Sequence, residues 1–445
     1  MNNSIAKEFN LKSLIKFSIP TIVMMLFMAL YTIVDGVFVS RIVGINGLSA
    51  INIIEPLLNL FFGVGIMFGT GGSAIIGKKI GEKKDAEANG DLSLIVLAVF
   101  CISIVMGILS LLFLDNIIYF LGANNVLFEY CFDYLKIYLL FVPFLMFQLV
   151  FSSLFVTAGK PTLGLFFTIL AGISNIFLDY LFMVPMDMGI SGAALGTIIG
   201  YSIPSCAGLI FFIVNKKGLH FSAIDKNPSV LINCMTNGAS EMVGHISMCI
   251  TNWMFNVSLM KLIGEQGVAA ISLLLYAQFL FNSMYMGFSS GVAPVISYNY
   301  GSNNDTQLQV VFKNSLKIIA VSTVSIFLLS LVFAKDVVTI FIPVTHEAHS
   351  LALRAYLLFS VTFLFSGFNI FASSMFTALS NGKISALISF MRTFVFIAGA
   401  ILILPLFMGT DGLWIAIPTA EILALVISFV CIVKQKDKYN YIGEN

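Results

Sequence analysis

Four side chains that carry oxygen atoms interrupt otherwise apolar stretches of the sequence. Asp35 lies in the run 14–40, Asn175 and Asp179 lie four residues apart in a second run, and Thr197 lies in a third. Residues at positions i and i+4 share one face of a helix. An ionisable group inside a membrane span costs roughly 3 kcal/mol or more unless it is paired, hydrated or neutralised, so its presence indicates function.

These residue types suggest one kind of chemistry. Carboxylate, amide and hydroxyl oxygens suit a hard cation such as Na+, and two carboxylates that lie close together cannot both ionise cheaply where the dielectric is low. We therefore predict a coupling-ion site for H+ or Na+ at Asp35, Asn175, Asp179 and Thr197. The alternative is a set of unrelated polar residues, each bonded locally. We expect no cofactor, and the scattered cysteines form no metal-binding pattern.

The composition indicates an integral membrane protein. Of 445 residues, 59% are hydrophobic and only 10% are charged, and the mean hydropathy is +0.99. A soluble chain carries about 25% charged residues. No removable signal peptide is evident, because the first apolar run is long enough to remain as a span. The basic residues are spread over short loops and form no stripe, so nucleic acid is not an expected partner.

The apolar runs predict an all-α protein with twelve transmembrane helices. We place the spans at 14–40, 50–76, 92–114, 130–157, 162–184, 190–213, 230–260, 268–296, 315–334, 352–379, 384–408 and 412–433. Lysines gather before the first span, in the even-numbered loops and after the last span. Because basic residues are retained on the cytoplasmic side, both termini are predicted to be cytoplasmic in a multi-pass protein of the cell membrane.

This orientation gives each predicted site residue a depth. Asp35 lies late in a span that runs outward, and so do Asn175 and Asp179, whereas Thr197 lies early in a span that runs inward. All four are therefore expected in the outer half of the membrane.

An internal repeat divides the chain. The segment VSRIVGINGLSAI aligns with LMKLIGEQGVAAI at an offset of 220 residues, which also places Gly71 on Gly291 and Gly81 on Gly301. Each half holds six predicted spans, so the two bundles should be related by a pseudo-two-fold axis along the membrane normal. We expect an N-terminal lobe at 1–214, a cytoplasmic linker at 215–228 and a C-terminal lobe at 229–445. At this offset the four site residues fall on Phe255, Val395, Gly399 and Ile417, so the second half lacks the set.

The second half has charges of its own. Glu241 and Arg392 both lie about a dozen residues or fewer into spans that start in the cytoplasm, so the two side chains are at similar depth. An ion pair between them is geometrically possible, and we favour a structural role for it over a role in transport. His245 and Glu421 are the other ionisable groups within these spans, and we interpret His245 as a satisfied core residue.

A substrate cavity is also predicted. Glu55, Asn59, Tyr138 and Gln148, with methionine and phenylalanine side chains, could line it, because adaptable apolar walls and a buried acid attract organic cations. The alternative is ordinary helix packing. The glycine-rich segment GTGGSAIIGKK lacks the spacing of a phosphate-binding loop, and no other enzyme motif is present.

The stretches IPTIVMMLFMALYTIVDGVFVSRIVGINGLSAINIIEP, GKKIGEKK and YAQFLFNSMYMGFSSGVAPVISYNYG resemble the multidrug and toxic compound extrusion (MATE) family. The resemblance implies a V-shaped pair of six-helix bundles and drug export driven by Na+ or H+. It also implies an ion site in the first lobe at Asp35, Asn175, Asp179 and Thr197, and a bending proline at Pro20. The tenth span has no acid, so the second-lobe carboxylate site of some members is not carried over.

We therefore expect a secondary active exporter, most simply a monomer, that exchanges amphipathic and mostly cationic organic compounds for H+ or Na+ by alternating access. One alternative is a lipid-linked oligosaccharide flippase of the same superfamily, which should have more basic residues facing its cavity than Arg392 alone. Another is a membrane-embedded enzyme or receptor, for which the sequence shows neither a catalytic pair nor a large soluble domain.

Overall fold

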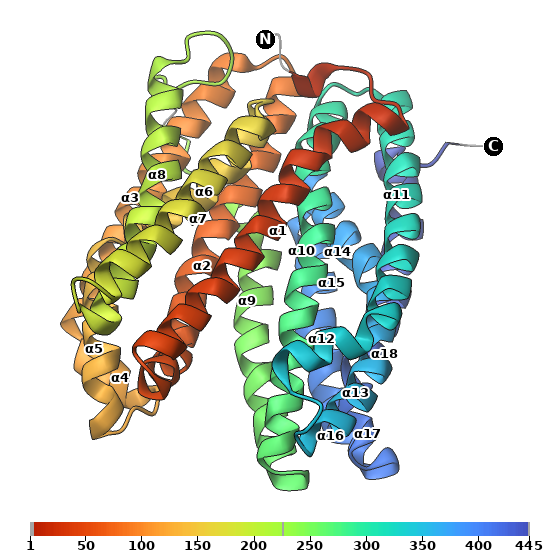
Figure 1. The fold of residues 1–445 in the computed structure, drawn as a ribbon. Helices are drawn as coiled ribbons and strands as arrows, with labels where there is room; N and C mark the ends of the chain where they lie inside the picture. The colour runs from red at the N-terminus through yellow and green to blue at the C-terminus, as the bar shows by residue number, and fades with distance from the viewer. Residues whose placement is uncertain (1–3, 225–226, 444–445) are drawn as a thin grey trace.

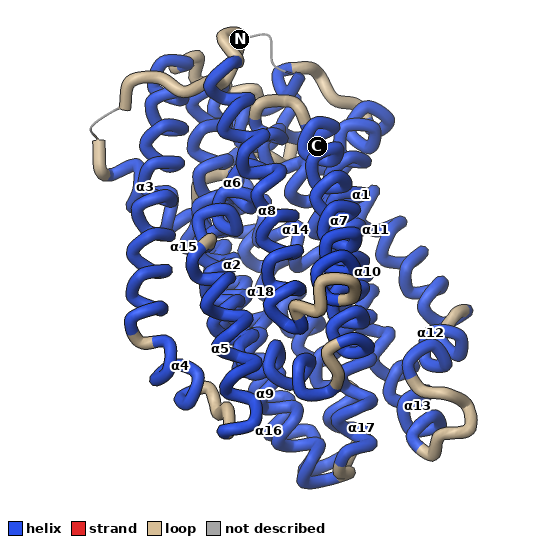
Figure 2. Tube along the Cα trace, turned by 60° about the vertical axis from the view of Figure 1, so that its left-hand side comes forward, coloured by secondary structure: helices blue, strands red, loops and turns tan. Residues whose placement is uncertain are grey.

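The computed structural model describes residues 4–224 and 227–443, and within these ranges the chain forms helices and no strands. This confirms the predicted all-α class. Short loops join the helices, most of which run roughly along one direction (Figure 2).

Helices of the first half lie on one side of the molecule and helices of the second half on the other (Figure 1). The first half consists of η1 (Ser4–Ala6), α1 (Leu11–Ile42), α2 (Ile45–Gly81), α3 (Asp85–Leu112), α4 (Leu114–Phe120), α5 (Asn125–Leu140), α6 (Val142–Thr157), α7 (Pro161–Met183) and α8 (Gly189–Val214). The second half consists of α9 (Ser229–Leu262), α10 (Glu265–Gly301), α11 (Asp305–Val332), α12 (Ala334–Phe341), α13 (Ala348–Phe359), η2 (Ser360–Thr362), α14 (Phe363–Ala378), α15 (Gly382–Phe390), η3 (Met391–Val395), α16 (Phe396–Met408), α17 (Asp411–Trp414) and α18 (Ala416–Tyr439).

Most of these helices can cross a membrane. Among the described residues, ten helical stretches are long and apolar enough, and the bent pair α5 and α6 makes an eleventh. The remaining predicted span corresponds to α9, which has 34 residues but carries many polar side chains along its length. About 20 residues suffice to cross the hydrocarbon core, so α9 has the length of a twelfth span.

The predicted span 130–157 is not one straight helix. It divides at Phe141 into α5 and α6, which meet at an angle of 59°. Pro143 occupies the first turn of α6. A proline cannot donate the intrahelical hydrogen bond, its ring clashes with the carbonyl four residues earlier, and it disfavours the helical conformation of the residue before it. The chain therefore starts a new helix at this point.

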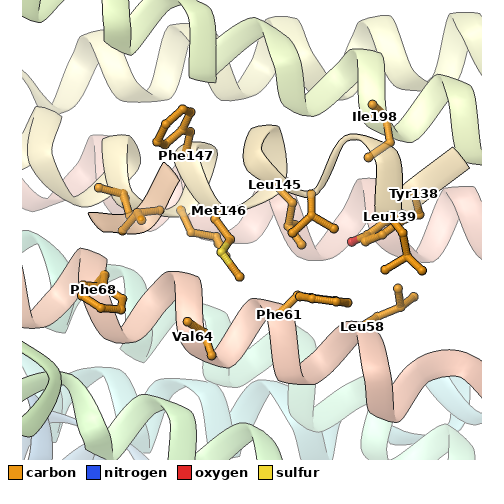
Figure 3. Packing of buried hydrophobic residues seen from close by; sticks show 14 of the residues in the cluster. Leu58, Phe61, Val64, Phe68, Tyr138, Leu139, Leu145, Met146, Phe147 and Ile198 are labelled. Atoms are coloured by element: carbon orange, nitrogen blue, oxygen red, sulfur yellow. The ribbon is translucent and has the colours of Figure 1, made fainter. Parts of the chain in front are cut away.

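Apolar side chains fill the space between α2 and the α5–α6 pair. Side chains from both sides face each other in this core (Figure 3), among them Leu58, Phe61, Val64, Phe68, Leu139, Leu145 and Met146. In a bilayer the association of helices depends on such van der Waals packing, because lipid tails are as apolar as the side chains.

The two halves contact each other closely near one end of the molecule, which we call the termini side. Both ends of the chain bind the start of α11 here: Gln307 donates to the carbonyl of Phe9 at 2.9 Å, and Asn440 donates to Asp305 at 3.0 Å. Glycines permit the close approach, because a Cβ atom at Gly71 or Gly238 would collide with the backbone of the opposite half. From this side α1 slants away from α9 and α10 (Figure 1).

Candidate functional site

The structure brings the four predicted ion-site residues together inside the first half. Asp35 comes from α1, Asn175 and Asp179 from α7, and Thr197 from α8. Asp179 is fully buried, and Asn175 and Thr197 are 3% and 7% exposed. Asn175 donates from Nδ2 to the hydroxyl of Thr197 at 3.4 Å.

Glycines create the space that this cluster occupies. A Cβ atom at Gly196 of α8 would collide with Oδ1 of Asp179, and one at Gly200 would lie 3.2 Å from Cβ of Asn175. On the other side of α7, Gly172 lets the rings of α1 approach, because a Cβ atom there would collide with Tyr31. Small residues at these positions thus allow α1, α7 and α8 to meet at the acids.

The cluster consists mainly of hydrogen-bond acceptors. The carboxyl groups of Asp35 and Asp179 lie within hydrogen-bonding reach of each other. Within the described part of the chain, Oδ1 of Asp35, both carboxyl oxygens of Asp179 and Oδ1 of Asn175 are buried and accept no hydrogen bond. Buried acceptors without donors are costly, so this arrangement favours a proton or a small cation between them.

Tyrosines surround the acidic pair, and sequence reasoning missed most of them. Tyr31, Tyr134, Tyr138 and Tyr201 all lie near enough to Asp35 to interact with its charge. Each could have been found by helix periodicity: Tyr31 precedes Asp35 by four residues, Tyr201 follows Thr197 by four, and Tyr134 precedes Tyr138 by four. Phenol groups can orient toward a carboxylate or a bound cation, so they complete a polar pocket in an apolar lobe.

The predicted cavity residues do not share one location. Tyr138 and Gln148 are buried inside the first half, where Gln148 lies within hydrogen-bonding reach of Tyr31. Glu55 and Asn59 lie instead on the side of α2 that faces α9. Asn59 donates to Glu55 over 3.5 Å, and its Oδ1 lies 3.2 Å from Nδ1 of His245 on the opposite half. The single cavity that we predicted from these residues is therefore two separate environments.

The predicted ion pair between Glu241 and Arg392 is corrected by the structure. Arg392 binds Glu421 instead, with 2.8 Å between the two charged groups and further contacts from Nε at 2.9 and 3.0 Å. Asn369 donates to Glu421 at 2.7 Å and receives a hydrogen bond from Ser428 at 2.9 Å. The physical reason is that Glu421 is only 3% exposed, so its buried charge needs a partner, and Arg392 in the π-helical turn η3 supplies it.

The kind of ion is limited by the ligands present. Among the described residues no group of three or more His, Cys, Asp or Glu side chains could hold a metal ion. The Asp35 cluster instead combines two carboxylates with an amide and a hydroxyl, which are ligands for a proton or a hard monovalent cation.

Comparison with known proteins agrees with this architecture. The model of the MatE family matches residues 20–181 and 245–402, one stretch in each half. The chain belongs to the MatE family. The matched stretches include Pro20, Asp35, Asn175 and Asp179 in the first half and Arg392 in the second.

Individual members of the MatE family match nearly the whole chain. "Multidrug export protein MepA" of Staphylococcus haemolyticus (strain JCSC1435) is 23% identical over 427 residues, which cover 94% of this chain and 92% of that protein. The protein of the same name from Staphylococcus aureus (strain MRSA252) is 22% identical over 424 residues, which cover 94% and 93%.

Solved MatE structures share the fold. A structure described as the "Outward-facing conformation of a multidrug resistance MATE family transporter of the MOP superfamily" superposes with a TM-score of 0.91 at 20% identity and covers 97% of both chains. "Crystal structure of MATE in the bent conformation" gives a TM-score of 0.89 at 20% identity and also covers 97% of both chains. These likenesses confirm the predicted membrane fold of two helical bundles.

Proposed function

We propose that this protein is a secondary active multidrug exporter that exchanges amphipathic, mostly cationic organic compounds for H+ or Na+. Membership of the MatE family and the names of the MepA relatives support export. The observation that carries the coupling is the pair Asp35 and Asp179, in which Oδ1 of Asp35 and both carboxyl oxygens of Asp179 are buried and lack donors among the described residues. A pair of this kind requires a cation, and a cation that enters from one side and leaves on the other can drive transport.

The orientation that we propose places both termini in the cytoplasm of a cell whose membrane the protein spans. The lysines beside the spans support it. In that orientation the termini side, where the halves are in close contact, faces the cytoplasm. The Asp35 cluster then lies in the outer half of the membrane, and the arrangement of the lobes corresponds to an outward-open state.

We divide the protein into an N-terminal lobe at 1–214, a linker at 215–228 and a C-terminal lobe at 229–445. The close contacts of α7 with α8 and of α2 with α6 support the first lobe as one structural unit. The contacts of α14 with α18 support the second lobe in the same way. Each lobe holds its own apolar core, so a single chain suffices for the transport cycle and we propose a monomer.

The coupling element in this proposal is α1. It is one continuous helix through Pro20, carries Asp35 near its far end, and meets α10 of the opposite lobe beside the proline. At Gly287 and Gly291 of α10 a Cβ atom would collide with Thr21 or Ile22 of α1. A proline within a helix permits bending, because one backbone hydrogen bond is missing. A cation bound at Asp35 would change the position of α1, and that change would be transmitted to the contact between the lobes.

To drive transport, the cation needs only to bind the two conformations of the protein with different affinities. If it binds Asp35 and Asp179 more tightly in one arrangement of α1, it shifts the population toward that arrangement. The substrate would bind between the lobes, where Glu55 supplies a negative charge on the α2 face. An acid among apolar and aromatic side chains favours organic cations.

The experiment is dye efflux from proteoliposomes under an imposed Na+ gradient or an imposed proton gradient, applied one at a time. We expect the Asp35→Asn variant to lose at least tenfold of its ion-driven efflux and still bind substrate. Glu129→Gln removes an exposed carboxylate of α5 and serves as the control. Full ion-driven efflux by a folded Asp35→Asn protein would refute this proposal.

The flippase alternative gains no support from the described residues. Arg392, the basic residue deep within a span, is already neutralised by Glu421, so it offers no free positive charge to a pyrophosphate.

A further inference from the structure

A chain of three polar side chains crosses from the first half of the molecule to the second. His245 of α9 lies with its Nδ1 atom 3.2 Å from Oδ1 of Asn59 on α2, and Asn59 in turn contacts Glu55. The chain begins one helical turn beyond Gly63, where an added Cβ atom would lie 3.3 Å from the backbone of Met242. It therefore lies just past the close contact of α2 with α9, on the side away from the termini. Asn59 and His245 have no part in the mechanism above.

The carboxylate of Glu55 fixes the direction of each hydrogen bond in this chain. An ionised carboxylate can only accept. The amide of Asn59 must therefore turn its Nδ2 group toward Glu55, and it donates to Oε1 over 3.5 Å. Oδ1 of Asn59 is left to face His245, so Nδ1 of the imidazole must carry a hydrogen. One protonation state of Nδ1 thus corresponds to one orientation of the amide and to one donor for the carboxylate.

The imidazole ring is itself held against the first half. It stacks on Phe62 of α2, with the ring centroids 6.5 Å apart and the planes inclined by 19°. Cβ of His245 is also close to α2, because a Cβ atom added at Gly63 would lie 3.4 Å from it. A ring packed in this way has few orientations open to it, so its Nδ1 atom stays directed at Asn59.

The carboxylate at the end of the chain remains accessible. Glu55 is exposed, whereas Asn59 and His245 are partly buried. Tyr276 of α10 and Cys249 of α9 lie near enough to Glu55 to interact with its charge. Groups from one helix of the first half and two helices of the second therefore meet at one acid. A carboxylate beside an aromatic ring suits the charged centre of an organic cation.

The internal repeat indicates that helix packing does not require these polar groups. At the offset of 220 residues the three members of the chain have apolar equivalents, namely Leu275, Phe279 and Met25. These residues belong to α10 and α1, which cross in the equivalent contact between the halves. One of two equivalent crossings thus forms with apolar residues at these positions, so the polar residues at the other point to recognition and not to folding.

We infer that Asn59 and His245 are positioning residues for the substrate. They hold the carboxylate of Glu55 in one orientation toward the space between the lobes, where it receives the charged centre of an organic cation. A free glutamate side chain loses rotamer freedom when it binds, whereas one that is already held in its bound orientation binds more tightly. His245 acts through Asn59 and does not touch the substrate. This inference rests on the proposed function, in which Glu55 attracts cationic compounds.

The test compares a cationic with an uncharged compound of similar shape on the full chain in proteoliposomes. The probes are tetraphenylphosphonium and triphenylphosphine oxide. Loss of one hydrogen bond corresponds to roughly a fivefold change in affinity. We therefore expect His245→Met to raise the KM for tetraphenylphosphonium by about fivefold, with an unchanged kcat and an unchanged KM for the oxide. Methionine stands at the equivalent position of the repeat, so it should fit the helix contact.

Further variants separate positioning from a structural role. His245→Asn keeps a donor near the place of Nδ1 and should restore most of the lost affinity. In the Glu55→Gln background His245→Met should have no additional effect, because the charge that it positions is gone. Asn59→Leu should reproduce His245→Met, and it carries the comparison if His245→Met does not fold. His349→Met is the matched control, since it removes a buried histidine that lies 3.2 Å from Thr339, and both KM values should stay unchanged.

The outcomes distinguish this inference from the function on which it rests. A folded His245→Met or Asn59→Leu protein with wild-type KM values would overturn the inference. Equal losses for both compounds, or an additive loss in the Glu55→Gln background, would do the same. Equilibrium binding of both probes to purified protein gives a readout that does not depend on ion coupling. Wild-type protein that binds the two probes equally well, with no change on Glu55→Gln, would instead refute the recognition of cations by Glu55 itself.

Discussion

The carboxyl groups of Asp35 and Asp179 lie within reach of each other across the contact between α1 and α7. Within the described chain, Oδ1 of Asp35 and both oxygens of Asp179 accept no hydrogen bond. Two negative charges at this separation in a medium of low dielectric repel each other strongly. The pair therefore links the position of α1 to the presence of a positive charge between the two helices.

Replacement of Asp179 by Asn should stabilise the cation-free protein. The change removes one of two like charges and adds a donor for Asp35, so the melting temperature in Na+-free buffer at alkaline pH is expected to rise by a few degrees. If Na+ is the coupling ion, its addition should stabilise the wild-type protein but no longer stabilise the variant. Thermal unfolding in detergent with and without Na+ measures both effects. If Na+ stabilises the wild-type protein and stabilises the variant equally, the assignment of Asp179 is contradicted.

Gly196→Ala should disrupt the ion site by steric collision, without removing any of its polar groups. The added Cβ atom would collide with Oδ1 of Asp179, although alanine itself favours the helix by up to about 1 kcal/mol. We expect ion-driven efflux to fall at least tenfold. Gly399→Ala is the matched control, because Gly399 is the equivalent of Asp179 in the repeat and no atom lies within 4 Å of the position that its added methyl group would take. Equal losses in both variants would show that the effect is not specific to the site.

The pair Arg392 and Glu421 should contribute mainly to stability. Removal of one member of a buried ion pair leaves an uncompensated charge, at a cost of about 3–5 kcal/mol. Arg392→Gln and Glu421→Gln should each lower the melting temperature, and the double variant should be less destabilised than the sum of the two. A double-mutant cycle from thermal unfolding measures the coupling. Additive effects would mean that the contact of 2.8 Å carries no net energy.

Glu55→Gln should change selectivity for substrate charge. Glu55 receives a hydrogen bond from Asn59 and lies on the α2 face toward α9, so its charge can attract a cationic compound between the lobes. We expect the KM for a cationic dye to rise several-fold, whereas transport of an uncharged compound should change little. Efflux assays with both compounds in parallel measure the difference. A similar change for both compounds would indicate a structural effect instead.

Much of the architecture was predictable from local patterns. Hydropathy identified the membrane class, because a span needs about 20 apolar residues in sequence and leaves a continuous signal. The offset of 220 residues indicated two similar halves, and the family match in both halves agrees with it. Asn175 and Asp179 could be placed on one helix face, since the helix repeat is a property of neighbouring residues. The transport roles of these residues stay predictions.

Contacts between helices that are far apart in the sequence could be identified only from the tertiary structure. The partner of Arg392 is Glu421 and not Glu241, and only the packing of α18 against η3 revealed which of the two acids lies at the guanidinium group. The break at Phe141 was missed because proline also occurs within continuous helices, as Pro20 does in α1.

The sequence by itself determined that this chain is a membrane protein of repeated helical bundles with acids in its spans, because hydropathy and periodicity are local. Only the tertiary structure decided which of those acids share a pocket. It placed Asp35 beside Asp179, and it paired Arg392 with Glu421. The physical reason is that the packing of helices far apart in sequence depends on glycine positions, bends and side-chain shapes acting together, and no single segment carries that information.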